Sequence, residues 1–476
     1  MKNVINIIIN GMYQLFLVLI PVVTMPYVAR VLGASNLGLY AYSFSIVNFL
    51  GVIINFGMNQ LGVREIAKSD NKLLLFDKLW KLQSRIGFII IFLYFLIVAL
   101  FVDNNKLLFL AHFFYLVSFL FDISWFFIGI GSIKKVVFRN TLVKIIGVVL
   151  IFTLIKDSND LNLYVLINGL TFLLSNLFFW IEIKKERKKN TSKGSLVVNE
   201  KLLFKNAFML LTPQIAVQIY TSLDKVIVRN LTDNIQVSFY DQSQKISRII
   251  LALITSVNII LMPKLAEKED SLSTYNIMKK SLFYTMFISF LCTILLLVNA
   301  YEFVPWFFGS EFKKMSTNMV LSSFIIPLIS IGGVFSTQYA LAKGFYQRYA
   351  FPYYVGSFIN VMLLISLAPR YGAIGATIAL VMTELLVFIV RIYVVKDEIS
   401  IPLLFNYTQW FQLLSVALIC YLIGYFLPIN TDSVFFNMFT KSAVVTICYF
   451  ISLLFLKTEI YIDLQKIIML IKERKK

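Results

Sequence analysis

The chain has 476 residues, of which 59% are hydrophobic and 14% are charged, with a mean hydropathy of +0.80 and a formal net charge of +19. Soluble domains are about half apolar and a quarter charged, so this composition excludes a soluble globular protein and indicates a multi-pass membrane protein. The three cysteines fall inside apolar runs, where we expect small packing residues and not a disulfide framework.

Apolar runs long enough to cross about 30 Å of hydrocarbon recur along the whole chain and predict an all-α membrane protein. The expected transmembrane spans are fourteen, at 8–29, 37–57, 86–102, 107–130, 140–155, 161–183, 206–228, 236–260, 282–299, 319–341, 351–368, 373–395, 410–427 and 441–456. Little chain remains between them, so no sizeable soluble domain is expected.

The basic residues are distributed unevenly between alternate loops. Counting residues at span ends with the loops that they border, 32 of the 44 Lys and Arg fall on the side of the two termini and 8 on the other side. Because basic loops stay in the cytoplasm, this asymmetry predicts two cytoplasmic termini. It also explains the net charge better than nucleic-acid binding does, so no nucleic-acid partner is expected.

Single polar residues interrupt the first half of the chain. Arg30 lies at the outer end of the first span, where it is either an anchor at the membrane interface or a cation of a cavity. Asp122 and Lys144 lie in the fourth and fifth spans and are candidates for an ion pair between neighbouring helices. For His112, the single histidine, a packing role is favoured over proton relay.

A basic linker separates two similar halves. The segment 184–205 contains KKERKKNTSKGSLVVNEK, the longest charged run in the chain. Residues 26–68 superpose weakly on 225–268, with Arg30 on Arg229 and Tyr40 on Tyr240. We therefore expect an N-lobe of six spans at 1–183, a C-lobe of six spans at 206–395, and two further spans at 396–476.

The seventh and eighth spans carry most of the charge within the membrane. One helix face is expected to hold Gln214, Gln218, Thr221 and Lys225, at steps of four, three and four, with Asp224 beside them. A second stripe is formed by Asp241, Gln244, Lys245 and Arg248. An ionised residue at mid-bilayer costs about 3 kcal/mol, so these faces must line protein or a wet cavity.

The twelfth span contains Glu384 and Arg391, of which Glu384 is expected to face the protein interior and Arg391 to anchor the helix end. The sequence offers little to an enzyme. It contains no P-loop, no H-E-x-x-H and no cysteine pair at metal spacing, so no cofactor and no metal are expected. Transport is the simpler interpretation.

Four segments carry a family resemblance: MPYVARVLGASNLGLYAYSFSIVNF, REIAK, SWFFIGIGSIKKVVFRNTLVKI and YVLING. In this order and spacing the chain resembles the Wzx-type polysaccharide flippases of the multidrug/oligosaccharidyl-lipid/polysaccharide (MOP) exporter superfamily. The resemblance implies two six-helix lobes plus two helices and alternating access through a central cavity. It also implies export of an undecaprenyl-diphosphate-linked oligosaccharide across the bacterial plasma membrane.

For this substrate, the resemblance and the charge pattern suggest the following roles. The expected substrate-binding residues are Arg30, Gln218, Asp224, Lys225, Asp241, Gln244, Lys245 and Arg248, and the candidates for ion coupling are Asp224, Asp241 and Glu384. The cations would neutralise a diphosphate, and the amides would contact the glycan. Alternatively, the five charges pair and lock the seventh and eighth spans together.

Other functions stay open. A flippase for lipid-linked peptidoglycan precursors and a drug/cation antiporter of the same superfamily would share the architecture, although the excess of cations argues against an antiporter. A membrane glycan polymerase or transferase would need a catalytic outer loop, and the outer loops are short and chemically plain. Polymerase and glycosyltransferase partners are expected for a flippase of this kind, beside the lipid bilayer.

Overall fold

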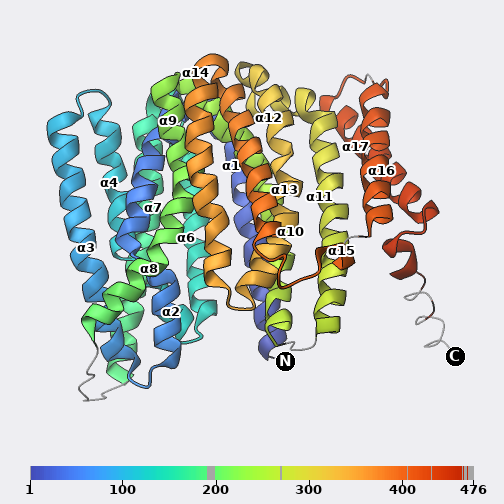
Figure 1. Ribbon diagram of the computed structural model, residues 1–476. Helices are drawn as coiled ribbons and strands as arrows, with labels where there is room; N and C mark the ends of the chain where they lie inside the picture. Colours follow the sequence, from blue (N-terminus) through green and yellow to red (C-terminus); the bar gives the residue numbers. More distant parts are fainter. Residues whose placement is uncertain are drawn as a thin grey trace. The chain divides into compact units, whose positions relative to one another are not determined.

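The computed structural model describes residues 2–189, 199–267, 271–404, 406–429, 431–463, 465 and 469 of the chain. This described part is built almost wholly from helices and holds no β-strand (Figure 1). The all-α architecture expected from the hydrophobic runs is therefore confirmed.

The expected spans coincide with helical segments. Ten segments are long and apolar enough to cross a membrane, and two of them, Ile20–Lys68 and Tyr346–Tyr393, contain two expected spans each. Asn140–Leu154 is apolar but shorter. The charged helix Asn234–Glu267 falls outside this set. This helix is long enough to cross a membrane, but its polar and charged residues make it less apolar than the ten segments.

The chain packs into two compact units, residues 1–238 and 239–476. The first contains α1 (Lys2–Asn55), α2 (Met58–Lys68), α3 (Lys72–Phe101), α4 (Lys106–Leu120), α5 (Ser124–Gly129), α6 (Ile133–Leu154), the 3-10 turn η1 (Ser158–Asp160), α7 (Leu161–Lys189), α8 (Glu200–Gln218), the π-helical turn η2 (Ile219–Leu223) and α9 (Asp224–Leu231). Within it α4 packs against α1, α3 and α7, and α1 packs against α8, η2 and α9. Buried aromatic residues, among them Phe76, Trp125 and Phe127, form one core of this unit.

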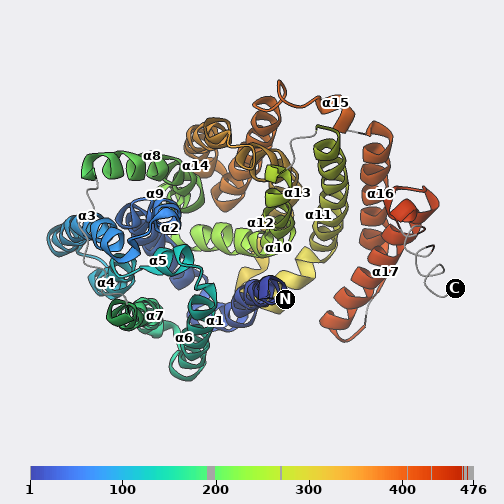
Figure 2. The same ribbon diagram turned by 90° about the horizontal axis from the view of Figure 1, so that it is seen from below.

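The second unit contains most of α10 (Asn234–Glu267), a helix that begins just before the boundary between the units. It further contains α11 (Ser271–Phe308), the 3-10 turn η3 (Ser310–Met315), α12 (Ser316–Ser323), α13 (Ile325–Gly333), the π-helical segment η4 (Val334–Leu341), α14 (Tyr346–Tyr393), α15 (Ile401–Leu404), α16 (Tyr407–Phe426) and α17 (Val434–Phe455). The last two helices pack against each other and against α11 (Figure 2). Exposed apolar side chains such as Phe411, Leu418 and Phe455 cover their outer faces, as a lipid-facing position requires.

Two glycines divide the longest helices. Gly33 interrupts α1 with φ 76° and ψ 170°, and Gly372 interrupts α14 with φ 57° and ψ −135°. Both conformations have positive φ, which glycine adopts without steric cost. Each break falls between two expected spans, so the chain passes from one span to the next with a single glycine in place of a loop.

The expected division into lobes at the linker stays a prediction. Residues 190–198 of that linker lie outside the described residues. The helices α8 and α9, which contain the expected seventh span, belong to the first compact unit, because they pack against α1.

Candidate functional site

A π-helical turn shapes the polar residues of the first unit. Between α8 and α9 the chain forms the π-helical turn η2, so the expected span at 206–228 is not a continuous α-helix. A π turn accommodates an extra residue and shifts the side chains that follow it, and such turns often occur at functional sites. The face proposed from steps of four and three is therefore rearranged between Gln218 and Lys225.

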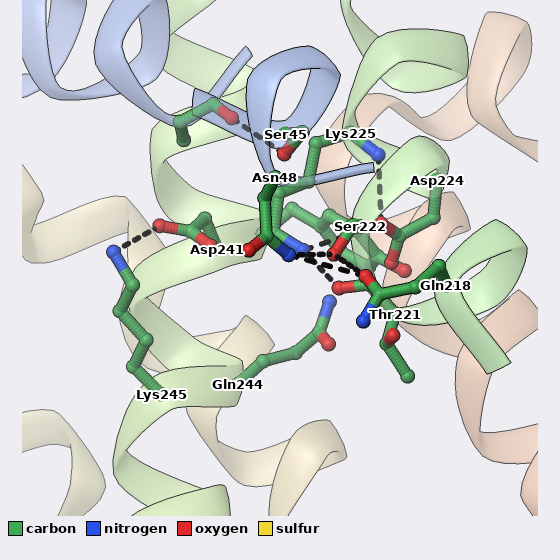
Figure 3. A network of polar contacts seen from close by, with 12 residues as sticks. Ser45, Asn48, Gln218, Thr221, Ser222, Asp224, Lys225, Asp241, Gln244 and Lys245 are labelled. Carbon is green, nitrogen blue, oxygen red and sulfur yellow. Dashed lines mark hydrogen bonds and ion pairs between the residues drawn. The ribbon is translucent and has the colours of Figure 1, made fainter. Parts of the chain in front are cut away.

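An amide and hydroxyl cluster ties η2 to α1. Asn48 Nδ2 donates to Gln218 Oε1 at 3.2 Å and to Ser222 Oγ at 3.3 Å (Figure 3). The Ser222 hydroxyl also donates to Gln218 Oε1 at 2.6 Å. Gln218, an expected glycan contact, thus accepts two hydrogen bonds and holds the turn against α1.

Asp224 and Lys225 form a buried ion pair at the start of α9. Asp224 is fully buried and Lys225 is 8% exposed, and Lys225 Nζ lies 3.2 Å from Asp224 Oδ1 (Figure 3). The same oxygen accepts the backbone N–H of Lys225 at 2.8 Å, while Nζ also donates to Thr221 O at 2.7 Å. The Lys225 charge is therefore neutralised within the first unit.

The charged stripe of α10 has a different character. Lys245 Nζ lies 2.6 Å from Asp241 Oδ2, yet the Lys245 side chain is 39% exposed while that of Asp241 is 5% exposed (Figure 3). Arg248 is half-buried, and its Nη2 donates a long hydrogen bond of 3.4 Å to Gln244 Oε1. Lys245 can therefore leave its carboxylate for another anion more easily than Lys225 can.

Gln244 contributes a buried donor without an acceptor. Its side chain is 2% exposed, and its Nε2 has no hydrogen-bond partner among the residues that the structure describes. Leaving a buried amide donor unpaired costs about 1–3 kcal/mol, so such groups usually indicate a function or an absent partner.

A second set of buried polar residues in the second unit lies on α14. Glu384 is 2% exposed and Arg391 is 4% exposed, and both Arg391 and Arg248 act electrostatically on Glu384. The Arg391 guanidinium lies 5.3 Å from the centre of the Tyr353 ring and against Gly332, where an added Cβ would come within 2.9 Å of Nη1. Glu384 is thus inside the protein, as expected. The expectation that Arg391 anchors the helix end is wrong, because its side chain is buried.

Several predicted residues lie elsewhere. Arg30 is exposed on α1, and His112 packs against Tyr40 and contacts Ser43 Oγ at 2.9 Å, which agrees with its expected packing role. No ion pair joins Asp122 to Lys144 in the described part of the first unit. The stripes of α9 and α10 belong to different compact units. That both stripes line one central cavity therefore stays a prediction.

Sequence reasoning missed the buried amides of the second unit. Asn258 donates to Ser330 O at 3.3 Å, and Asn360 donates to Thr383 Oγ1 at 3.3 Å. Both lie in apolar runs of the sequence. A single amide within such a run was the one feature that could have indicated a buried polar contact. The three cysteines are free thiols, and the described residues contain no cluster of His, Cys, Asp or Glu that could hold a metal ion.

Membrane-length helices with buried polar residues inside them define a multi-pass helical membrane protein. The model of the family described as "Polysaccharide biosynthesis protein" matches residues 4–268, which is more than half of the chain. The chain therefore belongs to the polysaccharide biosynthesis protein family.

Two curated relatives match over nearly their whole length. A protein of Shigella dysenteriae described as "Putative O-antigen transporter" is 22% identical over 405 residues, which are 83% of this chain and 100% of the relative. A protein of Escherichia coli (strain K12) with the same description is 22% identical over 83% of this chain and 96% of its own.

Solved structures with the same fold are transporters. The lipid II flippase MurJ in its inward closed conformation has a TM-score of 0.74 at 16% identity, covering 94% of this chain and 98% of that chain. An inward-facing multidrug resistance transporter of the MATE family, in the MOP superfamily, has a TM-score of 0.57 at 14% identity, covering 80% and 94%. At these identities the likeness supports the fold alone.

Proposed function

We propose that the protein flips undecaprenyl-diphosphate-linked oligosaccharide units from the inner to the outer leaflet of the bacterial plasma membrane. The observation that carries this proposal is the similarity to two O-antigen transporter relatives over 83% of the chain. The cationic stripe of α10 supports it, because Lys245 and Arg248 stay partly accessible.

The charges of α10 suit a diphosphate group. A diphosphate diester carries about two negative charges, which Lys245 and Arg248 can neutralise with charge-assisted hydrogen bonds. Asp241 Oδ2 lies 2.6 Å from Lys245 Nζ and so keeps the ammonium from facing lipid alone. Gln244 Nε2 supplies a further donor for a phosphate or glycan oxygen.

Lys225 has a more structural role in this proposal. Its ammonium is held by Asp224 and by the Thr221 carbonyl, and both side chains are nearly inaccessible. The alternative in which all five charges lock the helices together therefore fits the pair of α9 better than the stripe of α10.

The membrane potential provides a driving force. Moving two negative charges from a negative interior outward releases about 4–5 kcal/mol per 100 mV. Among the three candidates for ion coupling, Asp224 and Asp241 are engaged with lysines, while Glu384 Oε2 is buried without a hydrogen bond from the described residues. Glu384 is therefore the preferred site for a coupled proton or cation.

The test is glycan export in a host whose own flippase has been deleted. Lys245→Ala and Arg248→Ala are expected to abolish export of the surface glycan while the protein stays at wild-type abundance in the membrane, whereas Lys245→Arg keeps much of it. Lys313→Ala, which removes an exposed lysine of η3, is the matched control and should export normally. Normal export in both alanine variants of α10 would refute the proposed role of the stripe.

A further inference from the structure

A polar cavity lies within the first unit, among α4, α5, α6 and α7. Its volume is about 220 Å³, and its lining includes Tyr115, Asp122, Asn140, Lys144, Ser175 and Asn176. None of these residues belongs to the stripes of α9 and α10 that the proposed function uses. The cavity therefore requires its own explanation.

Among the described lining residues of the cavity, one is a cation and one is an anion, and these two do not pair with each other. Lys144 and Asp122 both line it, yet no ion pair or hydrogen bond joins them among the described residues. Asp122 Oδ1 accepts the backbone N–H of Ser124 at 2.9 Å, and Ser175 Oγ donates to Asn140 Oδ1 at 2.9 Å. Charged side chains inside membrane helices usually pair with an opposite charge or a polar group, so Lys144 calls for an anionic or strongly polar ligand.

The spans expected from the sequence place the Lys144 end of the cavity near the lipid head groups. Lys144 is the fifth residue of the span expected at 140–155, about 6 Å from the start of that span at 1.5 Å per residue. Its side chain slopes back toward the helix N-terminus, which brings the ammonium nearer the interface. Close by, Trp180 Nε1 donates to Phe121 O at 3.1 Å, and tryptophans are enriched at this depth of a bilayer.

The helices around the cavity are open to lipid from the side. On α6, Leu142, Ile145 and Ile146 are exposed, and on α7 the cavity residue Phe172 is 39% exposed. The two helices lie side by side (Figure 2). An apolar exterior next to a charged cavity allows acyl chains to stay in the bilayer while a polar head group enters.

We propose that this cavity binds the head group of a zwitterionic phospholipid, with the phosphate on Lys144 and the ammonium on Asp122. The separated charges of the cavity match the separated charges of such a head group. A cavity of about 150 Å³ holds benzene, so 220 Å³ accommodates the roughly eight heavy atoms of phosphoethanolamine. Free inorganic phosphate would satisfy Lys144 but would repel Asp122.

The test measures lipid retention by the purified, delipidated full-length protein with native mass spectrometry. Phosphatidylethanolamine, phosphatidylglycerol and phosphatidylcholine with identical acyl chains are offered in turn, together with an excess of inorganic phosphate in a separate arm. The wild-type protein is expected to retain the two zwitterionic lipids, phosphatidylethanolamine and phosphatidylcholine, in preference to the anionic phosphatidylglycerol, and inorganic phosphate should not displace phosphatidylethanolamine.

The variants separate the two charges. Lys144→Met should lower phosphatidylethanolamine retention at least about tenfold, and Lys144→Arg should preserve it. Asp122→Asn should remove the preference over phosphatidylglycerol. Lys185→Met, which removes an exposed lysine of α7, is the matched control and should bind as the wild-type protein does.

Folding is checked for each variant by size-exclusion chromatography, and Ser175→Leu, which fills the cavity without changing its charges, gives a second test. This variant should also lose the lipid. Equal retention by the wild-type protein, Lys144→Met and Ser175→Leu would overturn the proposal. Displacement of the lipid by inorganic phosphate would overturn it as well, because the site would then take the free anion.

Discussion

Asp224→Asn is expected to destabilise the first unit more than any other single neutralisation in the stripes of α9 and α10. The substitution keeps the shape of the side chain but leaves the ammonium of Lys225, which is 8% exposed, without its carboxylate. Breaking a buried ion pair by removing one partner costs about 3–5 kcal/mol. Because Lys225 Nζ also donates to Thr221 O at 2.7 Å, we expect the lower end of this range, about 3 kcal/mol.

The assay is a double-mutant cycle of thermal unfolding in detergent, with Asp224→Asn, Lys225→Met and the double variant. Removing both charges leaves no uncompensated ion, so the double variant should be more stable than Asp224→Asn alone. Asp233→Asn is the matched control, since Asp233 is exposed and an asparagine can still accept the hydrogen bond from Gln236 N. An unfolding temperature of Asp224→Asn equal to that of the control would refute the reasoning.

Three further substitutions test the packing of the helices by the same unfolding measurement. Gly33→Ala should cost about 1–3 kcal/mol, because φ 76° with ψ 170° is a conformation that essentially only glycine adopts; an unchanged unfolding temperature would contradict this account. Gly51→Ala should cost a similar ~1–3 kcal/mol, since its Cβ would lie 2.3 Å from the Phe119 ring, and the added substitution Phe119→Leu should restore part of the loss. Lys441→Met should destabilise the contact of α17 with α11 through the loss of the partly buried pair with Glu302 by about 1 kcal/mol, and Glu302→Gln should add nothing once Lys441 is gone.

The accessibility of the lysines distinguishes binding from structural roles in the proposed transport cycle. Lys225 and Lys245 each face an aspartate, but the Lys245 side chain is 39% exposed and that of Lys225 is 11% exposed. An exposed ammonium exchanges one anion for another at small cost, while a buried one does not. Export should therefore depend on the charge of Lys245 directly, and on that of Lys225 mainly through the stability of the protein.

The helical type of the membrane segments and their approximate positions could be predicted from the sequence, because each span must satisfy its backbone hydrogen bonds within itself and be apolar over a fixed length. The same constraint indicated that Asp224, Asp241 and Glu384 lie away from lipid. The sequence also carried the family resemblance, since its strings are local and keep their order along the chain. These properties depend on residues that are close in the sequence and on whether the surroundings are lipid or water. The order of apolar and polar residues along the chain reflects both.

Only the tertiary structure decided which polar groups meet. The π turn at Ile219–Leu223 changes the direction of the side chains after Gln218. Counting residues at the spacing of a regular α-helix does not predict this change. Arg391 proved buried beside Tyr353, although its place near a helix end favoured an interfacial anchor. Asp122 and Lys144 came to the same cavity without pairing. Contacts of this kind depend on how helices far apart in the chain pack and rotate against each other, and that information arises only when the chain has folded.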